Sequence, residues 1–186
     1  MIAGIIIGVV VVVLIMIFIG LYNSLVKRRN AVDNSWSQID VQLKRRHDLI
    51  PNLVESVKDY MSYEQETLAK VTEARAAAVA AGAKGPAQAA QAENALTDTL
   101  RSLFAVMENY PDLKASQNVM ALQEELTATE NKISFARQFY NDSVLTYNNK
   151  IQTVPSNVIA GMFNFTKRDY FEAPDAEREA PKVDLR

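Results

Sequence analysis

The sequence predicts an all-α fold, with an N-terminal transmembrane helix followed by an antiparallel four-helix bundle. Three observations support this prediction. A long apolar run opens the chain, apolar residues then recur every three or four positions, and no stretch alternates apolar and polar residues as a strand would. Of the 186 residues, about 130 remain for a fold once the two ends are set aside, enough for one domain with one core.

The opening apolar run is residues 2–19, IAGIIIGVVVVVLIMIFI, which carries no charge. Extended to residue 22, it spans about 20 residues, or about 30 Å as a helix, which matches the hydrocarbon thickness of a bilayer. It lacks the basic start and the cleavage site of a secretory signal. We therefore expect residues 1–22 to be an uncleaved single-pass anchor. Gly4 and Gly8 have the spacing that lets transmembrane helices approach closely, so they are candidate packing residues.

The flanks of the run predict its orientation. No basic side chain precedes it, whereas Lys27, Arg28 and Arg29 follow within two turns. The positive-inside rule then places the N-terminus outside and the bulk of the chain in the cytoplasm.

Residues 23–152 are expected to form the helical bundle. Gly82, Gly85 and Pro86 are typical of a helix end and a new helix start. The next helix is expected from about residue 86 to 109 and the last from about 116 to 152, with YPDLKAS as the turn between them.

Pro51 allows two interpretations. It could kink one continuous helix, or it could stand in the first turn of a new helix that Asp48 caps. Asp48 and Pro51 are thus a candidate helix junction, and a reversal there would give the fourth bundle helix. His47, the only histidine, has cationic neighbours, and the adjacent Asp48 would point to another helix face. We expect a charged, solvated surface there and no catalytic pair.

Composition argues against several kinds of chemistry. There is no cysteine, and the net charge of −2 gives no basic field for nucleic acid. The Glu-x-x-His pairs of di-iron bundles and the phosphate-binding loop motif are missing. We expect no enzymatic activity, no cofactor and no metal.

Some polar and aromatic residues fall within the helical stripes. They would either pair across the bundle and fix its register, which we favour, or line a groove that binds a peptide or another protein. They are Trp36, Glu130, Arg137, Tyr140 and Asn141.

Residues 153–171 form an amphipathic and aromatic segment that is too apolar for a free loop. Its apolar members are expected to fold back onto the end of the bundle, or to contact the membrane or a neighbouring subunit. They are Val158, Ile159, Met162, Phe163, Phe165, Tyr170 and Phe171. Residues 172–186 have two prolines and many charges, and we expect disorder there.

Taken in order, four stretches resemble the LemA family of bacterial membrane proteins. They are YNSLVKRRNAVDNSWSQIDVQLKRRHDLIPNLVESVKDYMSYE (residues 22–64), YPDLKAS (110–116), LQEELTATENKISFARQFYNDSVLTYN (122–148) and VPSNVIAGMFNFTKRDYF (154–171). The resemblance implies one N-terminal span in the bacterial inner membrane and an antiparallel four-helix bundle. It also favours a helix junction at residues 48–51. It implies no reaction and no catalytic residues.

We therefore expect a non-enzymatic, homo-oligomeric protein of the bilayer. Its role would be structural or scaffolding, in envelope organisation or membrane remodelling, with other envelope proteins as possible partners. The alternative is an adaptor or receptor that binds a peptide or envelope protein in the polar groove.

Overall fold

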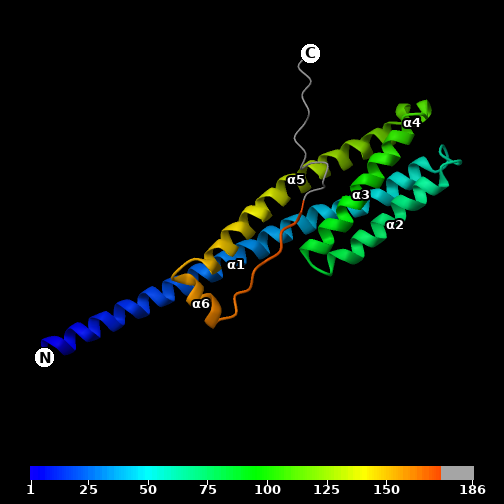
Figure 1. Ribbon diagram of the computed structural model, residues 1–186. Helices are drawn as coiled ribbons and strands as arrows, with labels where there is room; N and C mark the ends of the chain where they lie inside the picture. Colours follow the sequence, from blue (N-terminus) through cyan, green and yellow to red (C-terminus); the bar gives the residue numbers. More distant parts are fainter. Residues whose placement is uncertain (173–186) are drawn as a thin grey trace, which may run out of the picture. The chain divides into compact units, whose positions relative to one another are not determined.

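The computed structural model describes residues 1–172, and every regular element in this part of the chain is a helix. Figure 1 labels α1 (Ile2–Val57), α2 (Gln65–Gly82), α3 (Pro86–Met107), α4 (Pro111–Ala115), α5 (Gln117–Gln152) and α6 (Ser156–Met162). The predicted all-α class with a long apolar N-terminal helix is confirmed. Apart from Glu172, the tail for which we expected disorder lies outside the described residues.

The predicted helix junction at Asp48 and Pro51 is wrong. Helix α1 runs through both positions to Val57, with Pro51 inside it. The chain instead turns at residues 58–64, KDYMSYE, where Met61 is fully buried. No glycine or proline marks this turn, so the pattern that identifies most helix ends gave no signal there.

The other helix boundaries follow the sequence closely. Gly82 ends α2, Gly85 takes the N-cap of α3 with φ 112°, and Pro86 is its first residue. The positive φ at Gly85 is a conformation that favours glycine. The expected turn YPDLKAS contains the one-turn helix α4, and α5 begins at Gln117, one residue later than expected.

The chain divides into two compact units, and the larger one contains most of the helices. This second unit comprises Gln38–Arg137 and, among the described residues, 170–172. Its hydrophobic core draws on α1, α2, α3, α4 and α5 together, so four long helical segments and one short helix share it. The buried members are Ile50, Leu53, Val57, Met61, Leu68, Val71, Ala78, Leu96, Leu100, Leu103, Met107, Leu113, Val119 and Leu126.

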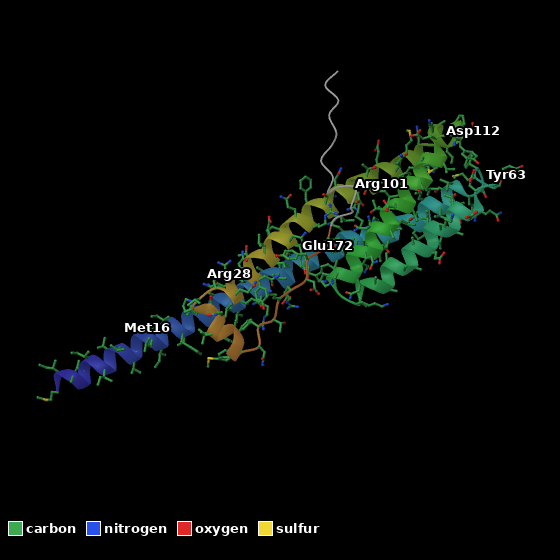
Figure 2. All side chains as sticks on the ribbon, in the orientation of Figure 1. Met16, Arg28, Tyr63, Arg101, Asp112 and Glu172 are labelled. Carbon is green, nitrogen blue, oxygen red and sulfur yellow. The ribbon has the colours of Figure 1, made fainter. Side chains whose placement is uncertain are left out.

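The first unit comprises Met1–Ser37 and Gln138–Asp169. Its buried residues lie on α1, on the end of α5 and on α6: Leu25, Val32, Ser35, Tyr140, Val144, Tyr147, Asn148, Ile151, Ser156, Ile159 and Ala160. The apolar run of α1 is exposed throughout residues 2–19. Figure 2 shows the side chains between the N-terminus and Met16 projecting outward with no other helix beside them. Within the described residues, α1 is the one helix long and apolar enough to cross a membrane.

Candidate functional site

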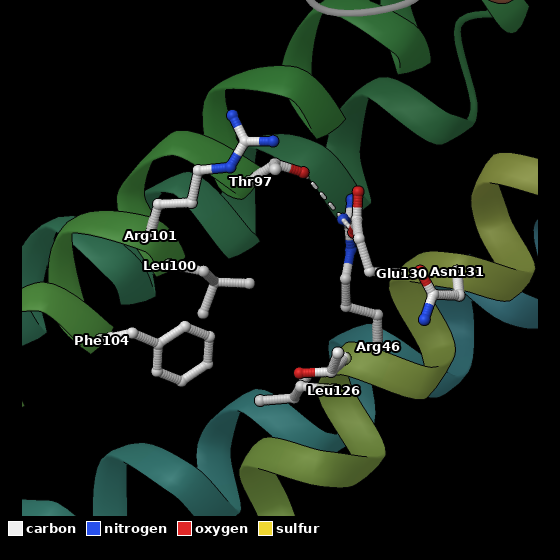
Figure 3. A pocket seen from close by; sticks show the side chains of 9 residues that line it. Arg46, Thr97, Leu100, Arg101, Phe104, Leu126, Glu130 and Asn131 are labelled. Atoms are coloured by element: carbon white, nitrogen blue, oxygen red, sulfur yellow. Dashed lines mark hydrogen bonds and ion pairs between the residues drawn. The ribbon is translucent and has the colours of Figure 1, made fainter. Parts of the chain in front are cut away.

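A buried cluster of charges lies in the core of the second unit, at Arg46 of α1. Only 2% of the Arg46 side chain is exposed, and it pairs with the equally buried carboxylate of Glu93 on α3. Its Nη1 also donates to Glu130 Oε2 on α5 at 2.5 Å and to Thr97 Oγ1 at 2.9 Å. Figure 3 shows Arg46, Thr97 and Glu130 converging from three helices. A single guanidinium group therefore links α1, α3 and α5.

His47 joins this cluster, so its predicted solvated position is wrong. Only 12% of its side chain is exposed, and its Nε2 lies 2.7 Å from Glu93 Oε1. Glu93 thus contacts Arg46 with one oxygen and His47 with the other. Burial acts to raise the pKa of Glu93, but the hydrogen bond from His47 and the charge of Arg46 outweigh it and hold the pKa below its usual value. The carboxylate is therefore ionised at neutral pH.

The backbone at His47 explains why α1 continues past Pro51. A proline has no N–H, so the carbonyl four residues earlier, that of His47, loses its partner within the helix. Nε of Arg75, on α2, donates to this carbonyl at 2.6 Å. The side chain from the neighbouring helix thus replaces the missing hydrogen bond, and it also fixes α2 against α1.

A cavity of about 140 Å³ opens beside the charge cluster (Figure 3). Its apolar lining comes from Leu100, Phe104 and Leu126, and its polar lining from Arg46, Thr97, Arg101, Thr127, Glu130 and Asn131. A space of this size would hold one side chain or a ring-sized group. Glu130 is the one predicted groove residue that lines it.

The remaining predicted groove residues belong to other surroundings. In the first unit, the rings of Trp36 and Tyr140 lie 5.6 Å apart, centroid to centroid. Arg137 donates to Ser134 Oγ within α5 at 3.4 Å, and Asn141 is half-buried. The polar groove that the sequence suggests as an alternative stays a prediction.

The chain itself occupies the surface near Tyr140. After α6, residues 166–169 run as an extended strap. Side chains of α5 form hydrogen bonds with the backbone of this strap. Tyr147 Oη donates to Thr166 O and Tyr140 Oη to Asp169 O, each at 2.9 Å. Asn148 both donates to Arg168 O and accepts from Arg168 N, again at 2.9 Å. Burial raises the pKa of Tyr140 to about 12, so its hydroxyl stays a neutral donor over the physiological range.

The strap also carries one ion pair, between Arg168 and Asp33 of α1 at 3.0 Å. Both side chains are about half exposed, so the pair adds little free energy of folding. The strap is therefore fixed mainly by the two tyrosines and Asn148.

An aromatic cluster lies where the apolar run of α1 ends. The ring of Phe163, just after α6, lies 4.8 Å from that of Tyr22 and 6.0 Å from that of Phe18. Phe165 stands 6.0 Å from Tyr22, and the guanidinium group of Arg29 lies 5.3 Å from the Phe165 ring centre. Helix α6 is therefore packed against the end of the predicted span.

The predicted membrane or subunit contacts divide by exposure. Val158, Met162, Phe163 and Tyr170 are exposed, whereas Ile159 and Phe171 are buried and Phe165 is partly buried. Gly4 and Gly8 have open space where a Cβ would lie, with none of the described residues packed against them.

Comparison with known proteins gives matches to one family and to several relatives. The model of the LemA family matches residues 35–185. Protein LemA of Metamycoplasma hominis is 27% identical over 164 residues, which cover 87% of this chain and 74% of that protein. Magnetosome protein MamQ 2 of Paramagnetospirillum magneticum is 25% identical over 179 residues, covering 83% of this chain and 66% of that protein. Magnetosome protein MamQ of Magnetospirillum gryphiswaldense is 24% identical over the same length. The chain spans about two thirds of these magnetosome relatives.

Proposed function

Because this chain belongs to the LemA family, we propose that it is a self-associating, membrane-anchored scaffold that helps to organise or remodel a bacterial membrane. The two relatives named as magnetosome proteins are compatible with such a role. The chain is a membrane-associated helical protein, and the scaffolding role is our inference.

The observation that carries this proposal is the uninterrupted passage of α1 from an exposed apolar run into the packed part of the first unit. No loop separates residues 2–19 from Leu25, which is fully buried. Eighteen exposed apolar residues would be strongly unfavourable in water, so a bilayer is the environment that they fit. A body joined to its span by one helix is suited to holding a fixed relation to the membrane surface.

Self-association is supported by apolar side chains that the chain leaves uncovered. Phe135 and Phe139 of α5 are 74% and 53% exposed, and residues four apart share a face of a helix. Exposed aromatic pairs of this kind are typical of protein contact surfaces. Gly4 and Gly8 offer a second contact, inside the membrane.

Orientation rests on Lys27, Arg28 and Arg29, which follow the span and favour a cytoplasmic body in the bacterial inner membrane. The chain has no cysteine, so Ser62→Cys in the exposed turn gives a single label site. An impermeant maleimide added to intact spheroplasts should label it only after permeabilisation. Labelling of the intact spheroplasts would reverse the orientation.

The alternative, an adaptor that binds a peptide, is less well supported. The strap of residues 166–169 covers the surface at Tyr140, whereas an open cavity lies beside Glu130. Alanine at Glu130, followed by pull-down from the native membrane, would favour the adaptor if one partner were lost while the helix content and melting temperature stayed unchanged.

The scaffold is tested with the full chain in bacterial membranes. It should resist carbonate extraction, run as an oligomer when its mass is measured in mild detergent, and change the shape of liposomes in electron micrographs. Release by carbonate would contradict the anchor. A strictly monomeric protein that leaves liposomes unchanged would contradict the scaffold while leaving the anchor intact.

A further inference from the structure

We propose that α6 is an interfacial lipid-binding helix, which lies at the membrane surface beside the span and contacts anionic phospholipids. The inference rests on the proposed membrane anchoring of α1. Of the two contacts expected for this segment, with lipid or with a neighbouring subunit, we propose lipid. The lipid-facing side is the α6 face, defined here as Val158, Met162 and Phe163.

The first step is the two-sided character of α6. Ser156, Ile159 and Ala160 are buried, with the spacing of one helical face. Val158 and Met162, four positions apart, are 62% and 65% exposed, and Phe163 is 47% exposed. Val154, just before the helix, is also exposed. The helix therefore packs one side against its own unit and presents an apolar side outward.

The second step is the level at which this side lies. Phe163 contacts both Phe18, inside the apolar run, and Tyr22, just beyond it. These two residues are about 6 Å apart along the helix axis, so Phe163 stands at the end of the span. Aromatic side chains are enriched at this level of a bilayer, and interfacial helices bury their apolar face about 5–10 Å into it. The α6 face is thus continuous with the surface that the span gives to lipid.

The third step is charge. Lys27, Arg28 and Arg29 follow Tyr22 within two turns of α1, and Arg29 lies over the ring of Phe165. Lys167, in the strap, follows two residues after Phe165. Basic side chains immediately beyond the apolar boundary are the recognised complement of anionic headgroups. An apolar face bordered by cations therefore fits a phospholipid that carries a net negative charge.

The test uses the photoreactive amino acid p-benzoylphenylalanine, placed at Met162 in the full chain and irradiated in native membranes. Mass spectrometry of the intact protein should show lipid adducts. The control site is Val41 of α1, which is 62% exposed but lies in the second unit, and it should give few lipid adducts. In membranes of defined composition, the fraction of Met162 adducts that contain an anionic lipid should exceed the mole fraction of anionic lipid in the membrane. Lys27→Gln with Lys167→Gln should remove that excess.

Three results would overturn the inference. Adducts at Met162 with a second copy or another protein would show that the α6 face is a protein contact. A lipid yield no higher than at Val41 would show that the face is not at the membrane. If the fraction of adducts that contain anionic lipid equalled the mole fraction of anionic lipid in the membrane, the α6 face would have no preference for anionic headgroups. All three can occur in a chain that resists carbonate extraction, so they are distinct from failure of the anchor, which extraction reports by itself.

Discussion

Arg46 shows how a single residue can be costly to bury and still hold the core in register. Removing a guanidinium group from water costs several kcal/mol even after relaxation. Glu93, Glu130 and Thr97 offset this cost by occupying both terminal nitrogens. A buried pair of this kind contributes little net stability compared with an apolar core. It does, however, make any register that separates the charges very unfavourable, and this is the role that we assign to the cluster.

The neighbouring arginines of α1 make this role measurable. Arg46→Gln should lower the free energy of unfolding by about 3 kcal/mol or more, because Glu93 and Glu130 then lose their buried cation. Arg45→Gln is the matched control, since the Arg45–Glu125 pair is about half exposed on both sides, and it should cost less than about 1 kcal/mol. Denaturant unfolding of the full chain in detergent, followed by far-ultraviolet circular dichroism, gives both values. Equal costs would contradict the assignment.

At the scale of the element, α1 depends on a contact from another helix to pass Pro51. A proline inside a helix is unfavourable by about 3 kcal/mol. Part of that cost is the His47 carbonyl, which the Arg75 guanidinium satisfies here. The continuity of α1 is therefore a tertiary property and does not follow from local helix propensity.

A double-mutant cycle tests this dependence. Arg75→Gln should destabilise the chain by about 1.5–3 kcal/mol, the usual range for a hydrogen bond to a charged group. In a Pro51→Ala background, the new N–H can bond to the His47 carbonyl, so the same substitution should cost at least about 1 kcal/mol less. Denaturant unfolding of the four proteins gives the coupling free energy. Additivity to within about 0.5 kcal/mol would mean that Arg75 does not compensate for the proline.

The same elements show what the sequence could predict. Gly85 and Pro86 act locally, so the start of α3 was predicted correctly. Arg46 carried a local signal as well, because it lies three residues after Leu43 and four before Ile50, both of which are buried. A run of three cations is nevertheless typical of a surface. The carboxylates that compensate its charge belong to Glu93 and Glu130, which follow Arg46 by 47 and 84 residues. No local pattern reveals partners at such a distance along the chain.

The strap was not predicted, and the continuation of α1 past Pro51 was only one of two alternatives, for a related reason. Asn148 binds the backbone of Arg168 from 20 residues away, and an asparagine in a helix gives no indication of such a partner. Arg75, 28 residues from His47, likewise could not be linked to Pro51 from periodicity. Local physical chemistry therefore predicts helices and their Gly/Pro boundaries, whereas buried polar partners depend on the packing of distant segments.

For the molecule as a whole, the decisive property is that apolar surface remains uncovered in several places. The span and the α6 face can both be covered by lipid. Phe135 and Phe139 lie on α5, well along the chain from the span, and lipid gives no comparable account of them. In the proposed self-associating scaffold, a second copy of the chain would cover these two phenylalanines.

This proposal predicts which substitutions dissociate the oligomer into monomers. Phe135→Gln together with Phe139→Gln should shift the mass of the detergent-solubilised chain toward the monomer, because polar side chains remove the apolar contact area. Val79→Gln is the control, since Val79 is a half-exposed apolar residue of α2, and it should leave the mass unchanged. Gly4→Ile with Gly8→Ile tests the span separately. An oligomer that survives the phenylalanine substitutions but is lost with the glycine substitutions would place self-association in the membrane and remove the α5 surface from the scaffold.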